Sequence, residues 1–263
     1  MEATHNAEEL DVRKSELVLW LKLNRPKALN ALTGTLVGAL TKAIEEAEHD
    51  PEVRVIVLTG EGRAFCAGAD LKDPARSRPE SGVEFVKAIG SLTELIESCS
   101  KPVIAAINGI AVAGGLELVL ACDVVLAAKS AVLGDAHSNY ALFPGAGATT
   151  RLPRKIGPNN AKFFMYTGDM GSADEWKTMG LVSQVLPDEG FIDSITKLAK
   201  KLAAKSPLVL SRMKQALNDG LEQSPAVSLR YERALGQLHH LSADRVEGLA
   251  AFKEKRTPQF QGK

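Results

Sequence analysis

The chain has 263 residues, of which 45% are hydrophobic and 24% are charged. This length and composition predict a globular protein that buries a sizeable core, as one large domain or as a domain with a small appendage. Thirty-two basic residues balance thirty-two acidic ones, which excludes a global field that would attract nucleic acid or an anionic membrane. Any anionic ligand must therefore be held by local contacts.

The N-terminal residues and the cysteines indicate a cytoplasmic protein. Cys66, Cys99 and Cys122 are odd in number and lack the close paired spacing of a zinc site. No hydrophobic leader precedes the first expected strand, so we expect neither a disulfide framework nor an exported protein. Residues 1–13 are polar and acidic, and we expect them to form a flexible extension rather than a transit peptide.

Hydrophobic periodicity predicts alternating strands and helices over most of the chain. Strands are expected over residues 17–23, 53–59, 103–107 and 124–127, and helices over residues 33–49, 83–98 and 114–122. Such alternation is typical of βα crossovers and a largely parallel sheet. The nearly apolar stretch 104–123 is not expected to cross a membrane, because it contains an asparagine, paired glycines and a central glutamate.

After about Pro187 the strand signals stop, and four helices are expected near residues 191–202, 210–221, 226–241 and 244–255. No linker rich in proline, glycine or serine separates them from the preceding residues, and no repeat of fixed period is present. We therefore expect an α/β core over residues 14–190 and a packed helical region over residues 191–263.

Glu117 is the most informative side chain, because it follows a double glycine inside an apolar run. A helix that begins near Gly114 places Glu117 in its first turn, where free N–H groups and the helix dipole favour negative charge. Glycine also permits a close backbone approach and a positive φ, so the Gly114 N–H is expected to point at a carbonyl oxygen that gains charge. The alternative is that Glu117 only caps the helix.

Five segments together closely resemble the crotonase superfamily, the enoyl-CoA hydratase/isomerase family. They are, in family order, Asn24–Ala31, Arg63–Leu71, Asn108–Cys122, Leu133–Gly147 and Phe252–Arg256. The resemblance extends from about Leu17 to Phe260. It implies a crotonase-like (ClpP/crotonase) spiral of ββα units, a C-terminal helical trimerisation region over residues 191–263, and a hexamer built as a dimer of trimers.

The resemblance also implies an acyl-CoA thioester substrate, with coenzyme A as part of the substrate and no metal or redox cofactor. The N–H groups of Ala67 and Gly114 would form an oxyanion hole for the thioester oxygen. Lys27 and Ala28 match positions near the CoA phosphates, and Lys255 would reach the CoA of a neighbouring subunit. The adenine would meet the loop formed by Ala64, Ala67, Gly68, Ala69, Asp70 and Leu71.

Hydratases of this family use two glutamates, and the second of these positions falls on His137. Histidine, with an ordinary pKa near 6.5, can still donate or accept a proton. The resemblance thus implies that Glu117 orients water onto Cβ and that His137 protonates Cα. Alternatively, His137 is a structural residue bonded to a backbone carbonyl, or Asp135 and Tyr140 take part instead.

The expected activity is that of an enoyl-CoA hydratase in fatty-acid or related acyl-CoA degradation. Because His137 departs from the family pattern, isomerisation, decarboxylation and hydrolysis of a carbon–carbon bond stay open, since one oxyanion pocket serves them all. A non-catalytic acyl-CoA binding protein is a further alternative. An RNA-binding relative is disfavoured, because the helix over residues 33–49 is acidic. Asp123 is expected to fix a backbone turn.

Overall fold

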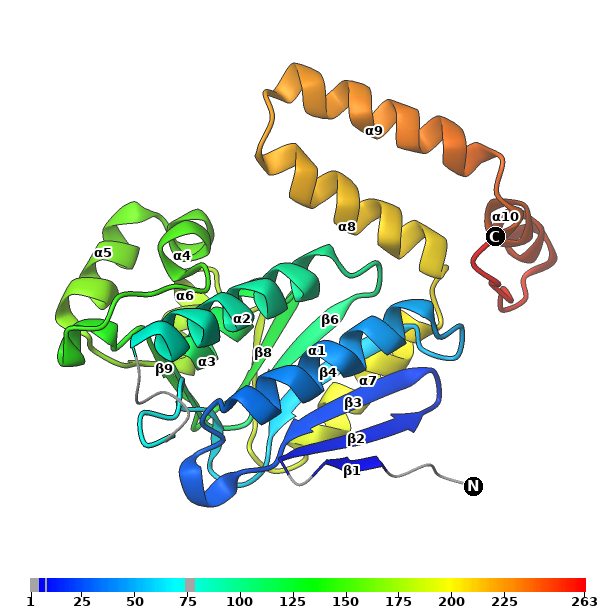
Figure 1. The fold of residues 1–263 in the computed structure, drawn as a ribbon. Helices are drawn as coiled ribbons and strands as arrows, with labels where there is room; N and C mark the ends of the chain where they lie inside the picture. Colours follow the sequence, from blue (N-terminus) through cyan, green and yellow to red (C-terminus); the bar gives the residue numbers. More distant parts are fainter. Residues whose placement is uncertain (1–4, 8, 74–78) are drawn as a thin grey trace.

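The computed structural model of the chain describes residues 5–7, 9–73 and 79–263, which form two β-sheets and a set of surrounding helices (Figure 1). The large sheet has the order β1-β2-β3-β4-β6-β8-β11 and the small sheet the order β10-β9-β7-β5. Strands of the large sheet are β1 (His5–Ala7), β2 (Leu10–Ser15), β3 (Val18–Leu23), β4 (Val55–Gly60), β6 (Val103–Ile107), β8 (Val124–Ala128) and β11 (Gln184–Leu186). Strands of the small sheet are β5 (Ala64–Cys66), β7 (Ile110–Val112), β9 (Val132–Gly134) and β10 (Gly171–Ser172).

The helices connect the two sheets and extend beyond them. They are α1 (Gly34–His49), α2 (Pro79–Ser98), α3 (Gly114–Ala121), α4 (Ala148–Ile156), α5 (Pro158–Thr167), α6 (Ala173–Thr178), α7 (Phe191–Ala203), α8 (Pro207–Leu221), α9 (Pro225–His240) and α10 (Ala243–Glu254). Two short 3₁₀ helices are η1 (Pro26–Ala28) and η3 (His137–Tyr140). No helix within the described ranges combines the length and the apolar run that crossing a membrane requires.

The chain winds as a spiral of ββα units. The units β4-β5-α2, β6-β7-α3 and β8-β9-α4 each contribute one strand to each sheet. As a result β4, β6 and β8 are parallel neighbours in the large sheet, and β5, β7 and β9 are parallel neighbours in the small sheet. This confirms the expected crotonase-like spiral. The units leave no fixed sequence period because α2 has 20 residues and α3 only eight.

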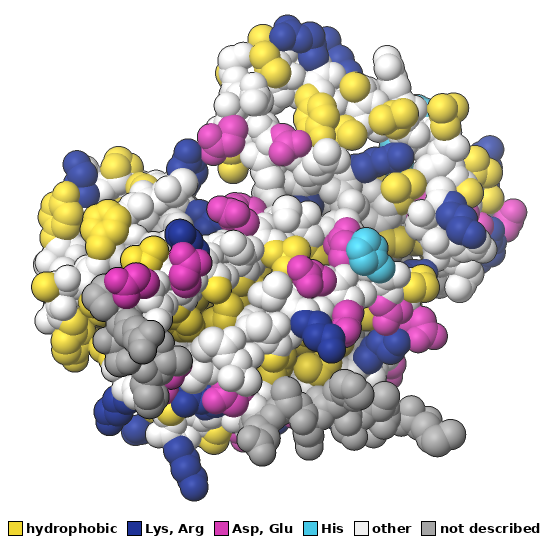
Figure 2. Space-filling view, viewed as in Figure 1, with side chains coloured by type: hydrophobic (Ala, Val, Ile, Leu, Met, Phe, Trp, Pro, Cys, Tyr) yellow, Lys and Arg dark blue, Asp and Glu magenta, His cyan; other side chains and the backbone are white. Residues whose placement is uncertain are grey.

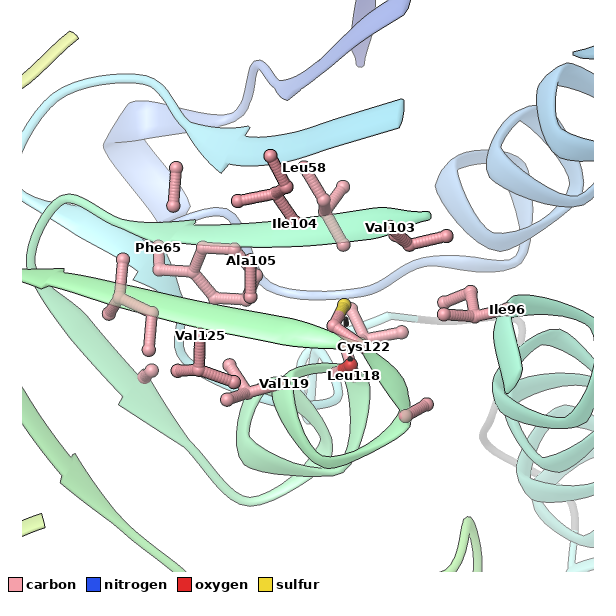
Figure 3. Packing of buried hydrophobic residues seen from close by; sticks show 14 of the residues in the cluster. Leu58, Phe65, Ile96, Val103, Ile104, Ala105, Leu118, Val119, Cys122 and Val125 are labelled. Atoms are coloured by element: carbon pink, nitrogen blue, oxygen red, sulfur yellow. Dashed lines mark hydrogen bonds between the residues drawn. The ribbon is translucent and has the colours of Figure 1, made fainter. Parts of the chain in front are cut away.

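The core lies between the large sheet and the helices that cover it. In Figure 1, α1 and α2 lie in front of this sheet and α7 lies behind it. Every residue of β4 and β6 is buried, as expected for parallel strands covered on both faces. Figure 3 shows the side chains of Val119 in α3 and of Cys122, which directly follows α3, beside Ala105 and Val125 of the sheet. The whole of α3 is buried, so Glu117 is placed inside the core.

The structure confirms the predicted helices and strands to within a few residues and corrects one boundary. The prediction of a flexible extension over residues 1–13 is wrong for the last part of that segment, because β2 pairs with β3 along its whole length. Leu10 is 1% exposed, so the strand is tied to the core. Residues 1–4 and 8 lie outside the described residues.

The C-terminal region consists of the four expected helices, and α8 and α9 form a hairpin that projects from the core (Figure 1). Lys214 of α8 attaches this hairpin to the core. Its Nζ donates to Asp123 Oδ2 at 2.8 Å and to the Ile96 carbonyl at 3.0 Å. Asp123 Oδ2 also accepts from the Val103 N–H at 2.7 Å, which confirms that Asp123 fixes the backbone.

We expect Gly115→Ala to destabilise the fold, because α3 lies directly against β5 at this residue. A Cβ on Gly115 would lie 2.1 Å from the Cys66 carbonyl oxygen, which is main chain and cannot rotate away. Overpacking of this kind costs about 1–3 kcal/mol of the free energy of unfolding. Gly38→Ala in α1 is the matched control, because its Cβ would meet no atom within 4 Å. Urea unfolding of both variants gives the comparison, and equal stability would contradict the packing argument.

Candidate active site

Three loops meet where the strands of the small sheet end. Because β5, β7 and β9 are parallel neighbours, their carboxyl ends lie at one edge, which is where α/β proteins place their ligands. The segments that follow these strands enclose a cavity of about 160 Å³ whose lining includes Ala69, Gly114, Glu117 and His137. Two larger grooves, of about 720 and 960 Å³, contain neither Glu117 nor His137. The chemistry therefore points to the smallest of these spaces.

The turn from β7 into α3 sets the position of Glu117. The positive φ that we expected at Gly114 belongs to Ala113, at φ 49°. Gly114 lies close to the loop after β5, since a Cβ there would lie at ordinary contact distances, 3.6 Å from the Ala69 nitrogen and 3.4 Å from Leu32 Cδ1. As the first residue of α3, Gly114 has an N–H without a partner inside the helix. This amide is thus available to a ligand.

The loop after β5 corrects the other half of the expected oxyanion hole. The Ala67 N–H donates to the Leu29 carbonyl at 3.0 Å, so it is not available for a thioester oxygen. No described residue accepts a hydrogen bond from the Ala69 N–H. The Ala69 amide, next to Gly114, is therefore the free donor of this loop. Ala67 and Leu71 remain part of the cavity lining.

Residues 25–32, which follow β3, hold this loop in place. This contact gives a structural reason for the family resemblance of the Asn24–Ala31 segment. The Leu32 N–H donates to the Gly68 carbonyl at 2.7 Å, and the Asp70 N–H donates to the Leu32 carbonyl at 2.9 Å. Arg25 Nη2 lies 2.9 Å from Asp70 Oδ2. In this parallel bridge the Ala69 N–H points away from residues 25–32, and Ala69 lines the cavity.

Glu117 is 3% exposed and is held by the Pro-Gly-Ala-Gly turn. Its Oε1 accepts from the N–H groups of Ala146, at 2.7 Å, and Ala148, at 3.2 Å. Burial raises the pKa of the Glu117 carboxyl, and these two hydrogen bonds offset the rise only in part. The raised pKa suits a group that takes up and returns a proton. Oε1 is fixed in this way, and Oε2 faces His137.

His137 lies across the cavity from Glu117, with Nε2 4.0 Å from Glu117 Oε2. The separation is too long for a direct hydrogen bond and short enough for one water molecule to bridge. On its other edge, His137 Nδ1 lies 3.1 Å from Asp135 Oδ2. The ring therefore contacts a carboxylate rather than the backbone carbonyl of the structural alternative. Tyr140 lines the same cavity but is 72% exposed.

The other residues expected to contact CoA lie outside this cavity. Lys27 and Ala28 form part of η1, Ala64 begins β5, and Lys255 is the C-cap of α10. Gly68 and Asp70 are bound to residues 25–32, as described above. Their contacts with CoA stay predictions. His239 of α9 contacts Arg212 at 3.1 Å and lies far along the chain from the site.

Sequence reasoning did not assign three contributors to the site: the Ala69 amide, the pair of amides that hold Glu117, and the contact of Asp135 with His137. The two amides follow from the Pro144–Gly147 turn, whose folding around a distant carboxylate leaves no local signal. The Asp-x-His spacing at residues 135–137 is a local signal, because a tight turn can return the histidine ring to an aspartate two residues earlier.

A spiral of ββα units, with free amides at the ends of β5 and β7 facing a buried carboxylate, defines a member of the crotonase superfamily. The family model described as enoyl-CoA hydratase/isomerase matches residues 13–263, and the chain belongs to that family. The chain is 42% identical to the putative enoyl-CoA hydratase/isomerase YngF of Bacillus subtilis (strain 168), over 95% of this chain and 96% of that protein.

Two further relatives agree with this assignment. The chain is 39% identical to the 2,3-dehydroadipyl-CoA hydratase of Escherichia coli (strain K12), over 97% of this chain and 99% of that protein. Its structure superposes with a TM-score of 0.94 on the crystal structure of an enoyl-CoA hydratase from Bacillus anthracis, which is 40% identical, covering 97% of this chain and 100% of that one. The likeness therefore covers both the core and the C-terminal helices.

Proposed function

We propose that the protein adds water across the double bond of a 2-enoyl-CoA to give a 3-hydroxyacyl-CoA. The observation that carries the proposal is the pair of proton-exchanging groups, Glu117 and His137, facing each other across a cavity that also contains free amides. A non-catalytic binding protein has no need of a buried carboxylate with a raised pKa at that place.

The thioester oxygen would be held by the N–H groups of Ala69 and Gly114. Hydrogen bonds to this oxygen stabilise the negative charge that develops when the double bond is attacked, and each such donor contributes about 2.7–4 kcal/mol in well-measured cases. Since the amides polarise the carbonyl, the proposal requires neither a metal nor a redox cofactor. Gly114 and Ala69 lie close enough for this, since a Cβ on Gly114 would lie 3.6 Å from the Ala69 nitrogen.

Glu117 and His137 would then move the protons. Glu117 Oε2 takes a proton from water while the water oxygen bonds to Cβ, and the electron pair of the double bond moves toward the thioester. Protonated His137 gives its Nε2 proton to Cα as the enolate collapses. The proton on Glu117 returns to His137 across the 4.0 Å gap through one bridging water molecule, so one water is added in each cycle.

Glu117→Gln is expected to remove hydration while it keeps the fold and the binding of CoA esters. A glutamine oxygen still accepts the Ala146 and Ala148 amides, but the side chain takes up no proton, and loss of acid–base catalysis costs about 10²–10⁴-fold in kcat. His137→Ala should likewise leave CoA binding intact.

The control is Glu48→Gln, which changes a carboxylate that accepts the Ser100 N–H on another side of the molecule. Turnover and CoA-ester affinity should be measured for all three variants. Near-wild-type turnover of Glu117→Gln would refute the proposed role.

The acyl group is proposed to be uncharged. Among the described residues that line the cavity, the charged side chains are Glu117 and His137, and the rest include Val86, Ile89, Val112 and Leu142. A carboxylate at the end of the acyl chain would lose its hydration without gaining a free cation.

We expect a 2-enoyl-CoA with an apolar chain to react with a kcat/KM about tenfold or more above that of an ester of similar length ending in a carboxylate. A panel of enoyl-, β-keto- and malonyl-type CoA esters, incubated in heavy water and followed by mass spectrometry, tests both substrate and reaction. Gain of heavy water by apolar enoyl esters supports the proposal. Double-bond migration alone, loss of carbon dioxide or chain cleavage would assign another enolate reaction.

Three buried and unpaired cysteines support a reducing compartment, and we propose the cytoplasm. Cell fractionation with an antibody to the protein tests this, and recovery in an exported fraction would contradict it.

The C-terminal helices support the proposed trimer or hexamer. Figure 2 shows hydrophobic side chains on the part of the surface that α8 and α9 form. Exposed apolar residues of α8, α9 and α10, and of the segment between the last two, include Met213, Leu217, Leu221, Leu229, Leu238, Leu241, Val246, Leu249 and Phe252. An apolar surface of this kind marks a contact between proteins.

Light scattering should give a mass of three or six chains of 28.1 kDa. The mass of a single chain would contradict the assembly.

A further inference from the structure

We propose that Asp135 is a positioning residue for catalysis: it fixes the ring of His137 so that Nε2–H faces Glu117 and the acyl cavity. This inference rests on the proposed function, since it assigns the partner of the proposed acid. Asp135 does not line the cavity and would act through His137 alone.

The backbone between the two residues brings them together. Ala136 has φ 55° and ψ 1°, a left-handed turn that directs the chain from β9 into η3. Asp135 then contacts His137 twice: Oδ1 accepts from the His137 main-chain N–H at 3.4 Å, and Oδ2 lies 3.1 Å from Nδ1. One carboxylate thus restrains both the main chain and the ring.

Burial favours a hydrogen bond between the side chains of Asp135 and His137. Asp135 is 1% exposed and His137 is 8% exposed. Within the described part of the chain, Asp135 Oδ2 and His137 Nδ1 are buried without an aligned hydrogen bond to any group, and each is the polar atom placed to serve the other. Leaving both unsatisfied is costly, so a proton belongs on Nδ1. Such bonds often become aligned only when substrate is bound.

The charges around the ring determine its protonation. His137 is faced by Asp135 from the β9–η3 turn and by Glu117 from α3, and the phenol of Tyr140 lines the same cavity. Burial alone would lower the pKa of His137, but the contacts with Asp135 and Glu117 outweigh it and raise the pKa. With the ring protonated, Glu117 is free to act as the base. The raised pKa favours the protonated ring, which is the form that the proposed acid role of His137 requires.

The test is Asp135→Asn, which keeps the side-chain shape and removes the charge. NMR titration of the His137 ring, assigned with His137→Gln, needs no substrate. The pKa of His137 is raised in the folded protein. The protonated ring therefore persists at pH values above the ordinary histidine pKa, and it is lost as the pH rises through the raised pKa. Asp135→Asn should lower this pKa and move the basic limb of the kcat/KM profile to lower pH.

Above its pKa, the protonated fraction falls about tenfold for each unit of that shift, and kcat should fall with it while KM changes little. Asp188→Asn is the control, because Asp188 binds Ser130 at the surface. Asp135→Glu, which restores the charge, should recover part of the shift. An unchanged His137 pKa and pH profile in Asp135→Asn would overturn the proposal.

Wild-type protein supplies a measurement that does not depend on the variant folding. Its Nδ1 should stay protonated on both sides of the titration, and an unprotonated Nδ1 in the neutral ring would also overturn the proposal. A lowered His137 pKa in Asp135→Asn, in a protein that hydrates no enoyl-CoA, would instead support the role of Asp135 and reject the proposed hydration. Failure of the role proposed for Asp135 can therefore be distinguished from failure of the proposed hydration.

Discussion

The parallel pairing of β5, β7 and β9 is the constraint on which the site depends. Each of these short strands is only three residues long, and each ends where a functional segment begins. The loop that contains the Ala69 amide follows β5, the turn into α3 follows β7, and the Asp-x-His segment at residues 135–137 follows β9. Because the strands run the same way, three segments that are far apart in the chain meet at one edge. The large sheet fixes the order of these strands through the adjacent β4, β6 and β8.

Within the described residues, buried charges lie beside compensating groups at two places that serve different purposes. Lys214 and Asp123 satisfy each other and the backbone at the base of the α8–α9 hairpin. In the cavity, two amides neutralise one side of Glu117, and Asp135 compensates the ring of His137. The difference is that Glu117 Oε2 and His137 Nε2 have no such fixed partner and face each other across a gap. The first arrangement is suited to structure, and the second to proton transfer.

The sequence was sufficient for the long elements, because their apolar residues recur with a helical period. In α1, α2 and α7 this face is buried, and in α8 and α9 it is largely exposed. The sequence was insufficient where contacts between distant residues determine which amide is free or whether a segment is ordered. The choice of Ala69 over Ala67 depends on hydrogen bonds to Leu29 and Leu32, and no property of two neighbouring alanines encodes it. Strand β2 was missed because its residues are mostly polar and its pairing with β3 supplies the order. Glu117 was found because a charge inside an apolar run is visible locally.

Ala113 has a consequence for how this family member can evolve. It is a residue with a side chain at φ 49°, a conformation that favours glycine, and it joins β7 to the helix of Glu117. Backbone strain of this type costs about 1–3 kcal/mol and persists only where the surroundings enforce it, here through the bond from the Ala113 N–H to the Gly134 carbonyl. The strained backbone of Ala113 thus lowers the free energy of unfolding and at the same time positions α3 with Glu117. Selection for higher stability would favour relief of this strain, and relief would disturb the geometry of the site.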